Sequence, residues 1–105
     1  MLKHIVLWRF LEHAEGRTKQ ENIEIIRAGL LALPAVIPEI RSMEIGLDVL
    51  HSGMSYDMAL IAEFDDMEAM QAYKNHPEHL KVAAIVAKTK SDRATIDFTE
   101  QGETK

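Results

Sequence analysis

The chain has 105 residues, a formal net charge of −5 and no cysteine. This composition excludes disulfide bonds, cysteine nucleophiles and metal sites built on cysteine, and an acidic chain without a Lys/Arg cluster argues against nucleic acid and membrane surfaces as partners. The N-terminal segment is too short and too charged for a signal peptide or a membrane span, so we expect a cytoplasmic protein.

The first half of the chain predicts a strand, a helix and a second strand. Residues 3–11 are rich in β-branched and aromatic side chains, which is typical of a strand. Thr18 and Glu21 form a capping-box pattern at the start of a helix, whose apolar stripe ends at Pro34. Apolar and polar residues then alternate over 40–49, so a second strand with one apolar face follows.

The second half predicts a strand, two helices and a last strand. Residues 57–64 are apolar except at their ends and form the strand. Asp65 and Glu68 again stand three apart, which indicates a helix start. This helix ends before Pro77, which suits the first position of the next helix. Alternation over 92–99 predicts the last strand.

The order β-α-β followed by β-α-α-β predicts an α+β sandwich of the ferredoxin-like type, with helices on one face of a four-stranded antiparallel sheet. Residues 1–99 form this single domain and residues 100–105 a polar C-terminal tail. The first and third strands also carry apolar residues on their other face. These residues are Ile5, Leu7, Ala59 and Ile61. An apolar sheet face needs a cover, so we expect a homodimer joined through the sheet faces.

The stretch "AYKNHPEH", residues 72–79, concentrates the candidate chemistry. His79 is the third residue of the predicted last helix, where the helix dipole lowers the pKa of an imidazole and favours the neutral base. Tyr73, from the end of the preceding helix, is placed to bind a carbonyl oxygen. The pair suits abstraction of a proton next to a carbonyl. Hydrogen bonds that merely close the edge of the core are the alternative.

Further candidates for ligand binding are His4 and Trp8, which share the apolar face of the first strand, and Met58 on the third strand. Simple core packing is the alternative for each of them, and the residue types favour it. His76 precedes Pro77 and has the pattern of a helix cap, although it stays a candidate for ligand contact. No carboxylate-rich ligand set accompanies the histidines, so we expect no metal site.

Three pieces of this sequence resemble the stress-responsive A/B barrel proteins, or Dabb domains. They are "LKHIVLWRF" at the start, the "IP-I" pattern at 37–40 and "AYKNHPEH". The resemblance covers residues 2–99 and implies a dimer whose two sheets pack face to face into an α/β barrel. The family includes plant stress proteins that assemble into rings, plant polyketide cyclases and many bacterial proteins of unknown role.

By resemblance to the cyclases, Tyr73 and His79 take part in ionising the substrate, His4 lies near the same pocket, and no cofactor is needed. At the third strand the cyclases carry a pocket histidine where this chain has Met58, which argues against activity on the same substrate. The leading hypothesis is a homodimer that binds or transforms a small carbonyl or aromatic metabolite as a cyclase, lyase or isomerase. The alternatives are a non-catalytic structural oligomer and, by fold analogy alone, a monooxygenase.

Overall fold

The computed structural model describes residues 1–99, and the predicted polar tail at 100–105 lies outside the described residues. The elements in chain order are β1 (Leu2–Phe10), β2 (His13–Ala14), β3 (Arg17–Thr18), α1 (Lys19–Leu31), the 3₁₀ turn η1 (Leu33–Ala35), β4 (Ser42–Leu47), β5 (Met58–Phe64), α2 (Met67–Asn75), α3 (Pro77–Thr89) and β6 (Lys90–Thr99). The four long strands form one antiparallel sheet in the order β4-β5-β1-β6. The predicted ferredoxin-like α+β fold is confirmed.

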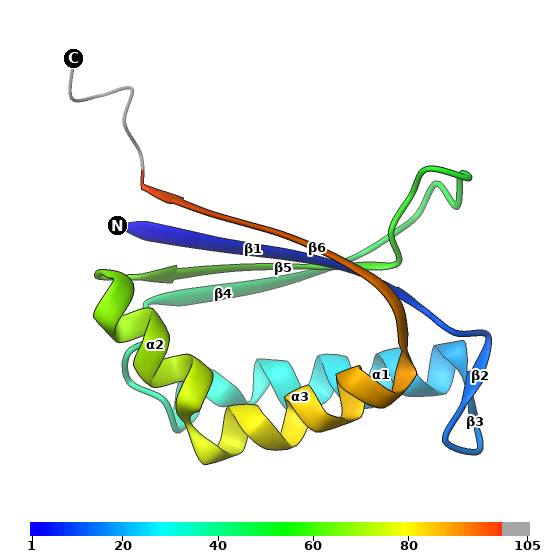
Figure 1. Ribbon diagram of the computed structural model, residues 1–105, viewed down its shortest axis with the longest axis horizontal. Helices are drawn as coiled ribbons and strands as arrows, with labels where there is room; N and C mark the ends of the chain where they lie inside the picture. Colours follow the sequence, from blue (N-terminus) through cyan, green and yellow to red (C-terminus); the bar gives the residue numbers. More distant parts are fainter. Residues whose placement is uncertain (100–105) are drawn as a thin grey trace.

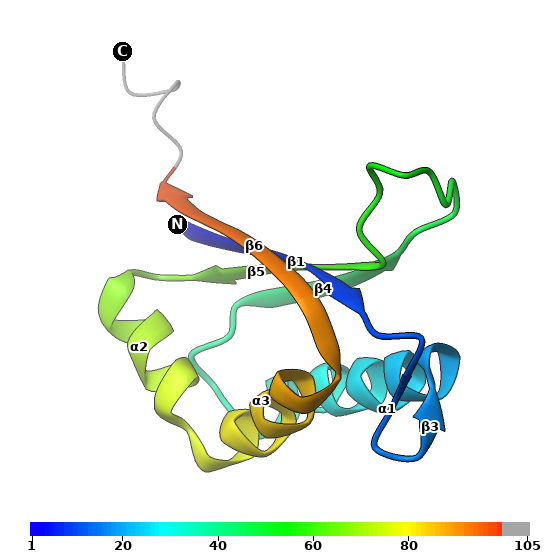
Figure 2. The same cartoon turned by 45° about the vertical axis from the view of Figure 1, so that its right-hand side comes forward.

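The helices all lie on one face of this sheet (Figures 1 and 2). The loop at residues 48–57, green in Figure 1, rises from the sheet on the opposite side. Strand β6 continues directly from the end of α3 and runs antiparallel to β1. The last strand therefore begins two residues earlier than the pattern at 92–99 predicts.

Strict alternation along β1 divides its side chains between the two faces of the sheet. Five residues are buried beneath the helices, namely Leu2, His4, Val6, Trp8 and Phe10. The intervening residues are half-buried and lie on the other face, which we call the open face. Its apolar members include the four predicted from the sequence and two from β6: Ile5, Leu7, Ala59, Ile61, Ile96 and Phe98.

Helix α1 begins with the predicted capping box, in which Thr18 and Glu21 satisfy each other's backbone N–H groups. The start of α2 differs from the prediction. Asp66, rather than Asp65, caps this helix by accepting a hydrogen bond from the Ala69 N–H. Asp65 instead forms a two-pronged ion pair with Arg41 at the start of β4. The predicted pattern pointed to Asp65, but its ion pair with Arg41 engages this carboxylate and the adjacent Asp66 caps the helix.

Helices α1 and α3 pack side by side against the sheet, and Gly29 lies at their crossing. A Cβ atom added at Gly29 would stand 3.1 Å from Val82 Cγ2 on α3. The absence of a side chain at this position therefore lets the two helices approach closely. Their shared inner surface and the buried face of β1 enclose the site described next.

Candidate functional site

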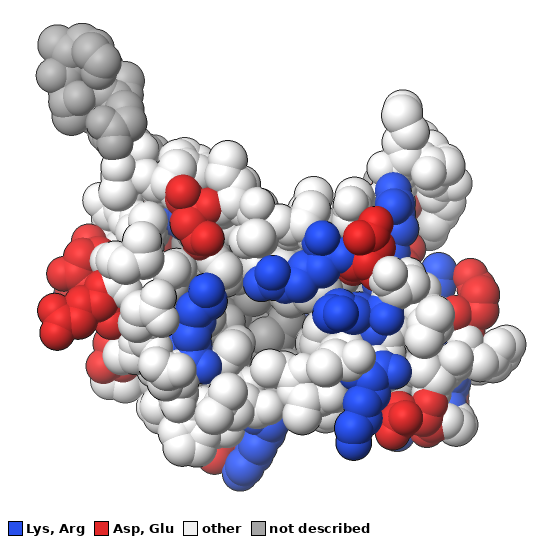
Figure 3. All heavy atoms as spheres, viewed as in Figure 1, with Lys and Arg blue, Asp and Glu red and all other residues white. Residues whose placement is uncertain are grey.

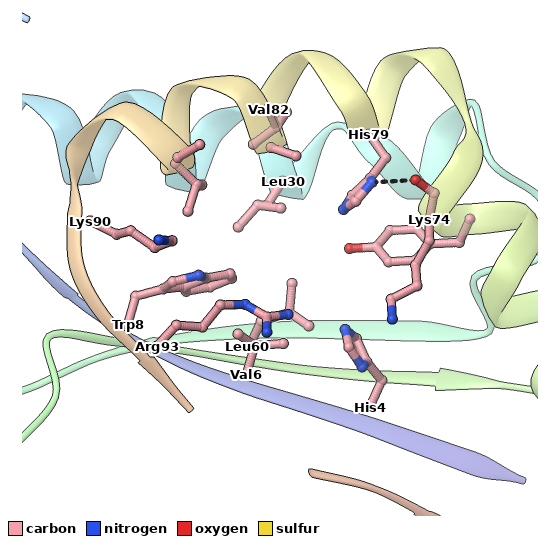
Figure 4. Close-up of a pocket in the computed structure, with 14 residues that line it drawn as sticks. His4, Val6, Trp8, Leu30, Leu60, Lys74, His79, Val82, Lys90 and Arg93 are labelled. Carbon is pink, nitrogen blue, oxygen red and sulfur yellow. Dashed lines mark hydrogen bonds between the residues drawn. The ribbon is translucent and has the colours of Figure 1, made fainter. Parts of the chain in front are cut away.

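A cavity of about 170 Å³ lies between α3 and the helix-covered face of the sheet (Figure 4). Its lining comes from β1, α1, β5, α2, α3 and β6. The lining residues are His4, Val6, Trp8, Leu30, Leu60, Tyr73, Lys74, His79, Val82, Ala83, Val86, Ala87, Lys90 and Arg93. Four of the six candidates named from the sequence thus meet in one place, since His4, Trp8, Tyr73 and His79 all line this cavity.

The other two candidates lie outside this lining. Met58 is 2% exposed and pairs with Trp8 across the strands β5 and β1, within the packed core. His76 caps α3, because its Nδ1 accepts a hydrogen bond of 3.1 Å from the Glu78 N–H. The cap predicted for His76 is therefore present. The His76 backbone N–H also donates to the Tyr73 carbonyl oxygen at 3.1 Å, but neither His76 nor Met58 lines the cavity.

Tyr73 lies in the last turns of α2 and is 2% exposed. Its ring centroid is 4.4 Å from that of His79 and 5.1 Å from that of Phe64. Burial raises the pKa of Tyr73 to about 12, against an opposing pull from the positive charge of Arg93. Within residues 1–99 the hydroxyl has no hydrogen-bond partner. The side chain is thus fixed by its ring, while its hydroxyl remains available to a molecule in the cavity.

His79 is held by a hydrogen bond of 2.9 Å between its Nδ1 and the carbonyl oxygen of Lys74. A carbonyl only accepts, so Nδ1 carries the hydrogen and the neutral ring has its lone pair on Nε2. Figure 4 shows this second ring nitrogen turned toward the cavity. The neutral ring therefore presents a base to whatever the cavity contains.

Burial is the main cause that lowers the pKa of His79 from its ordinary value of 6.5. The nearby charges of Lys74 and Arg93 act in the same direction, and the Lys74 carbonyl opposes them. The neutral base expected from the sequence is supported, although desolvation, rather than the helix dipole assumed there, is its largest cause. His79 stays uncharged to lower pH than an exposed histidine does.

His4 forms the floor of the cavity and is 3% exposed. Its Nδ1 lies 2.5 Å from Oδ1 of Asp97, its register partner on β6. Because the carboxylate accepts, Nδ1 carries the hydrogen, and the pair fixes the orientation of the imidazole. The His4 ring also packs edge-on against Tyr73, with 6.2 Å between centroids. A second oriented imidazole thus stands beside the Tyr73–His79 pair.

Positive charge gathers around this cavity. Lys74, Lys90 and Arg93 line it, and we call these three residues the cationic rim. Figure 4 shows their end groups turned toward the space between α3 and the sheet, and Figure 3 shows Lys and Arg atoms around the hollow there. In the part of the chain that the structure describes, no rim residue forms an ion pair with a carboxylate.

The sequence model of the stress responsive A/B barrel domain, Dabb, matches residues 2–100. The chain belongs to the Dabb family. Solved structures give the same fold. A dimeric ferredoxin-like protein of unknown function from Thermobifida fusca is 31% identical, with a TM-score of 0.80 over 94% of this chain and 90% of the other. A second such dimer, from Bacteroides fragilis, is 33% identical, with a TM-score of 0.76 over 94% of this chain and 95% of the other.

A hydroxynitrile lyase from Passiflora edulis shares the fold of this Dabb protein at 17% identity, with a TM-score of 0.79 over 96% of this chain and 94% of the lyase. At that identity the likeness concerns the fold alone. Dabb membership and the dimeric relatives agree with the resemblance seen in the sequence.

A metal-binding cluster and a membrane-spanning helix are both absent from the described part of this Dabb chain. Within residues 1–99, no three His, Asp or Glu side chains gather in a way that could hold a metal ion. None of the helices described there is long and apolar enough to cross a membrane.

The cationic rim and Asp97 escaped sequence reasoning. Lys74 stands inside the "AYKNHPEH" stretch, but Lys90 and Arg93 follow 16 and 19 residues later, as the difference in numbering shows. Only the register of β6 on β1 brings Arg93 beside Trp8 and Asp97 beside His4. The alternation of polar Arg93 and Asp97 on one face of the last strand was the available signal, and its interpretation needed the fold.

Proposed function

We propose that this Dabb protein is a homodimer that binds a small carbonyl or aromatic metabolite in the cavity and moves a proton at the carbon next to the carbonyl. One observation carries the proposal. The Tyr73 hydroxyl and His79 Nε2 line the same cavity, and neither has a hydrogen-bond partner among the described residues. Polar groups in a protein interior normally have hydrogen-bond partners, so two free ones in a cavity favour a bound molecule over a structural oligomer without chemistry.

In the proposed reaction, His79 Nε2 takes the proton from the carbon and becomes an imidazolium. The electron pair moves onto the carbonyl oxygen, where the Tyr73 hydroxyl donates a hydrogen bond to the developing enolate. Since the pKa of Tyr73 is about 12, the phenol keeps its proton and acts as a donor. His79 then returns the proton to carbon or to oxygen.

The same steps serve isomerisation, an aldol-type cyclisation or a lyase reaction, depending on what the enolate attacks or expels. The existence of a hydroxynitrile lyase with this fold is consistent with lyase chemistry on such a scaffold. His4, oriented by Asp97, lies close enough to the Tyr73 ring to contact the substrate from the sheet side. No step in this scheme needs a metal or an organic cofactor.

The homodimer is proposed on the open face. Ile61, Ile96 and Phe98 are 37%, 57% and 38% exposed there, which is a costly arrangement for a lone chain. The relatives from Thermobifida fusca and Bacteroides fragilis are described as dimeric. The loop at 48–57 adds exposed Val49, Leu50 and Met54 on the same side of the sheet. A second copy packed sheet to sheet would cover both apolar surfaces.

The catalytic proposal is tested by hydrogen exchange at carbon. Acetophenone and 4-oxo-4-phenylbutanoate are incubated with the protein in D₂O, and proton NMR follows the hydrogens next to the ketone. We expect exchange to be faster with the wild type and to fall on the order of 10²-fold or more in His79→Asn. His76→Asn is the matched control, because asparagine preserves the cap outside the cavity. Equal rates with wild type, H79N and no protein would refute the proposal.

A further inference from the structure

We propose that the ligand of this cavity is a small molecule with an apolar body and one anionic group, which the cationic rim and the indole N–H of Trp8 bind. The inference deepens the proposed function, and it rests on that function to the extent that the same cavity must hold a small molecule. It adds the chemical class of the ligand and the residues that select it.

The charge of the lining is the first argument. The chain as a whole has 17 acidic and 12 basic residues. Among residues 1–99, the lining of the cavity nevertheless contains three cations and no aspartate or glutamate. The neighbouring carboxylate of Asp97 is engaged with His4. Cations that gather without carboxylate partners against an acidic background favour an anion as the missing partner.

The rim residues also differ from two cations on the neighbouring elements α3 and β1. Lys81 on α3 pairs with Glu78 at 3.0 Å, and Arg9 on β1 pairs with Asp92 at the same distance. Lys74 and Arg93 instead lower the pKa of the His79 imidazole, which burial lowers most, and Arg93 also acts on Tyr73. A bound anion would be attracted by these charges.

Trp8 supplies an independent argument. The indole side chain is 6% exposed and lines the cavity, yet its Nε1–H is buried without a partner in the described structure. A buried donor left unpaired costs about 1–3 kcal/mol, so an acceptor at this position is favoured. Figure 4 shows the Trp8 ring between Lys90 and Arg93, which places the donor within the cationic rim.

The size and the remaining surface of the cavity define the rest of the ligand. A cavity of about 150 Å³ accepts one benzene ring, and this one has about 170 Å³. Its walls between the polar groups are aliphatic. They consist of Val6, Leu30, Leu60, Val82, Ala83, Val86 and Ala87. A single ring or a short aliphatic chain with an anionic substituent fits both the volume and the charges.

The test compares an anionic ligand with its neutral analogue and adds a second anion of another class. Wild-type protein is titrated with phenylacetate, its neutral analogue phenylacetamide and phenyl phosphate. The fluorescence of Trp8, the one tryptophan of the chain, reports on binding, and calorimetry confirms it. We expect phenylacetate or phenyl phosphate to bind at least about tenfold more tightly than the amide. The two anions distinguish a carboxylate from a phosphate ester as the preferred group.

Variants locate the effect. The double variant R93Q/K90Q should lose the preference for the anion, whereas K88Q should keep it, since Lys88 is an exposed lysine of α3 outside the lining. In the wild type, absence of the preference with normal hydrogen exchange would overturn this inference alone, whereas absent exchange in a protein that prefers the anion would overturn the proposed reaction alone. The inference is overturned if amide and anions bind equally, if neither anion binds at roughly millimolar concentration, or if R93Q/K90Q retains the wild-type preference.

Discussion

The substitution Tyr73→Phe tests whether the Tyr73 hydroxyl binds a ligand or stabilises the fold. Removing a hydroxyl that makes a good hydrogen bond costs about 1 kcal/mol, because its partner is left unpaired. The Tyr73 hydroxyl has no partner in the described structure, so its removal leaves no protein group unsatisfied. We therefore expect the free energy of unfolding to stay the same or to rise by up to about 1 kcal/mol.

The ring of Tyr73 has a different role. It packs at 5.1 Å from Phe64 and 4.4 Å from His79, measured between ring centroids, and is almost completely buried. Tyr73→Ala should therefore lower the free energy of unfolding by about 3–5 kcal/mol, as is usual when an aromatic side chain is deleted from a core. The contrast between the phenylalanine and alanine variants isolates the hydroxyl from the packing.

Urea denaturation at one fixed protein concentration measures both variants, since the proposed dimer would make apparent stability depend on concentration. Tyr56→Phe is the control, because the Tyr56 hydroxyl reaches Asp92 at 3.4 Å and Tyr56 does not line the cavity. A loss of more than about 1 kcal/mol in Y73F would mean that the hydroxyl holds the fold together. The hydroxyl would then not be free to bind a ligand.

Three further predictions follow from individual contacts. Burial lowers the pKa of His79 in the folded state, so unfolding takes up a proton below about pH 6.5 and the free energy of unfolding falls as the pH decreases. In H79N this decrease should be smaller. If H79N and wild type give matching denaturation curves between about pH 5 and 7, the pKa of His79 is not lowered by folding. Ile61→Asp on the open face should yield monomers or prevent folding. Ile25→Asp, at a similarly exposed site on α1, should leave the dimer intact. Light scattering measures the mass in solution, and a dimeric I61D would refute sheet-to-sheet packing. Gly29→Val should destabilise the chain by roughly 1–3 kcal/mol, because its Cβ would lie 3.1 Å from Val82 Cγ2. The second substitution V82A should recover part of this loss in thermal denaturation. Equal stability of G29V and wild type would show that α1 and α3 do not need a glycine to approach each other.

The sequence predicted those parts of the site that depend on local pattern. Alternation in β1 placed His4 and Trp8 on one face, and Pro77 separated the end of α2 from the start of α3. Tyr73 and His79 then met because the turn between their helices is tight. These features follow from the periodicity of strands and the stereochemistry of proline, which a single sequence displays.

The remaining parts depend on tertiary detail. The choice of Asp66 over Asp65 as a cap was made by Arg41, which is 24 residues from Asp65 in the chain. The cavity exists because Ala83 and Ala87 present short side chains on the inner surface of α3, and a few methyl groups would fill it. The His4–Asp97 pair depends on strand register. None of these three features can be deduced from the spacing of residues along the chain.

The most direct test of the central claim, that Tyr73 and His79 act together on one substrate, is a double-mutant cycle on the rate of hydrogen exchange next to the ketone. Residues that act as a unit are strongly non-additive, because removing either one already disables the shared step. We predict that Y73F/H79N exchanges hydrogen no more slowly than H79N alone. Rate losses that multiply in the double variant would show two independent groups, and would contradict the proposed mechanism.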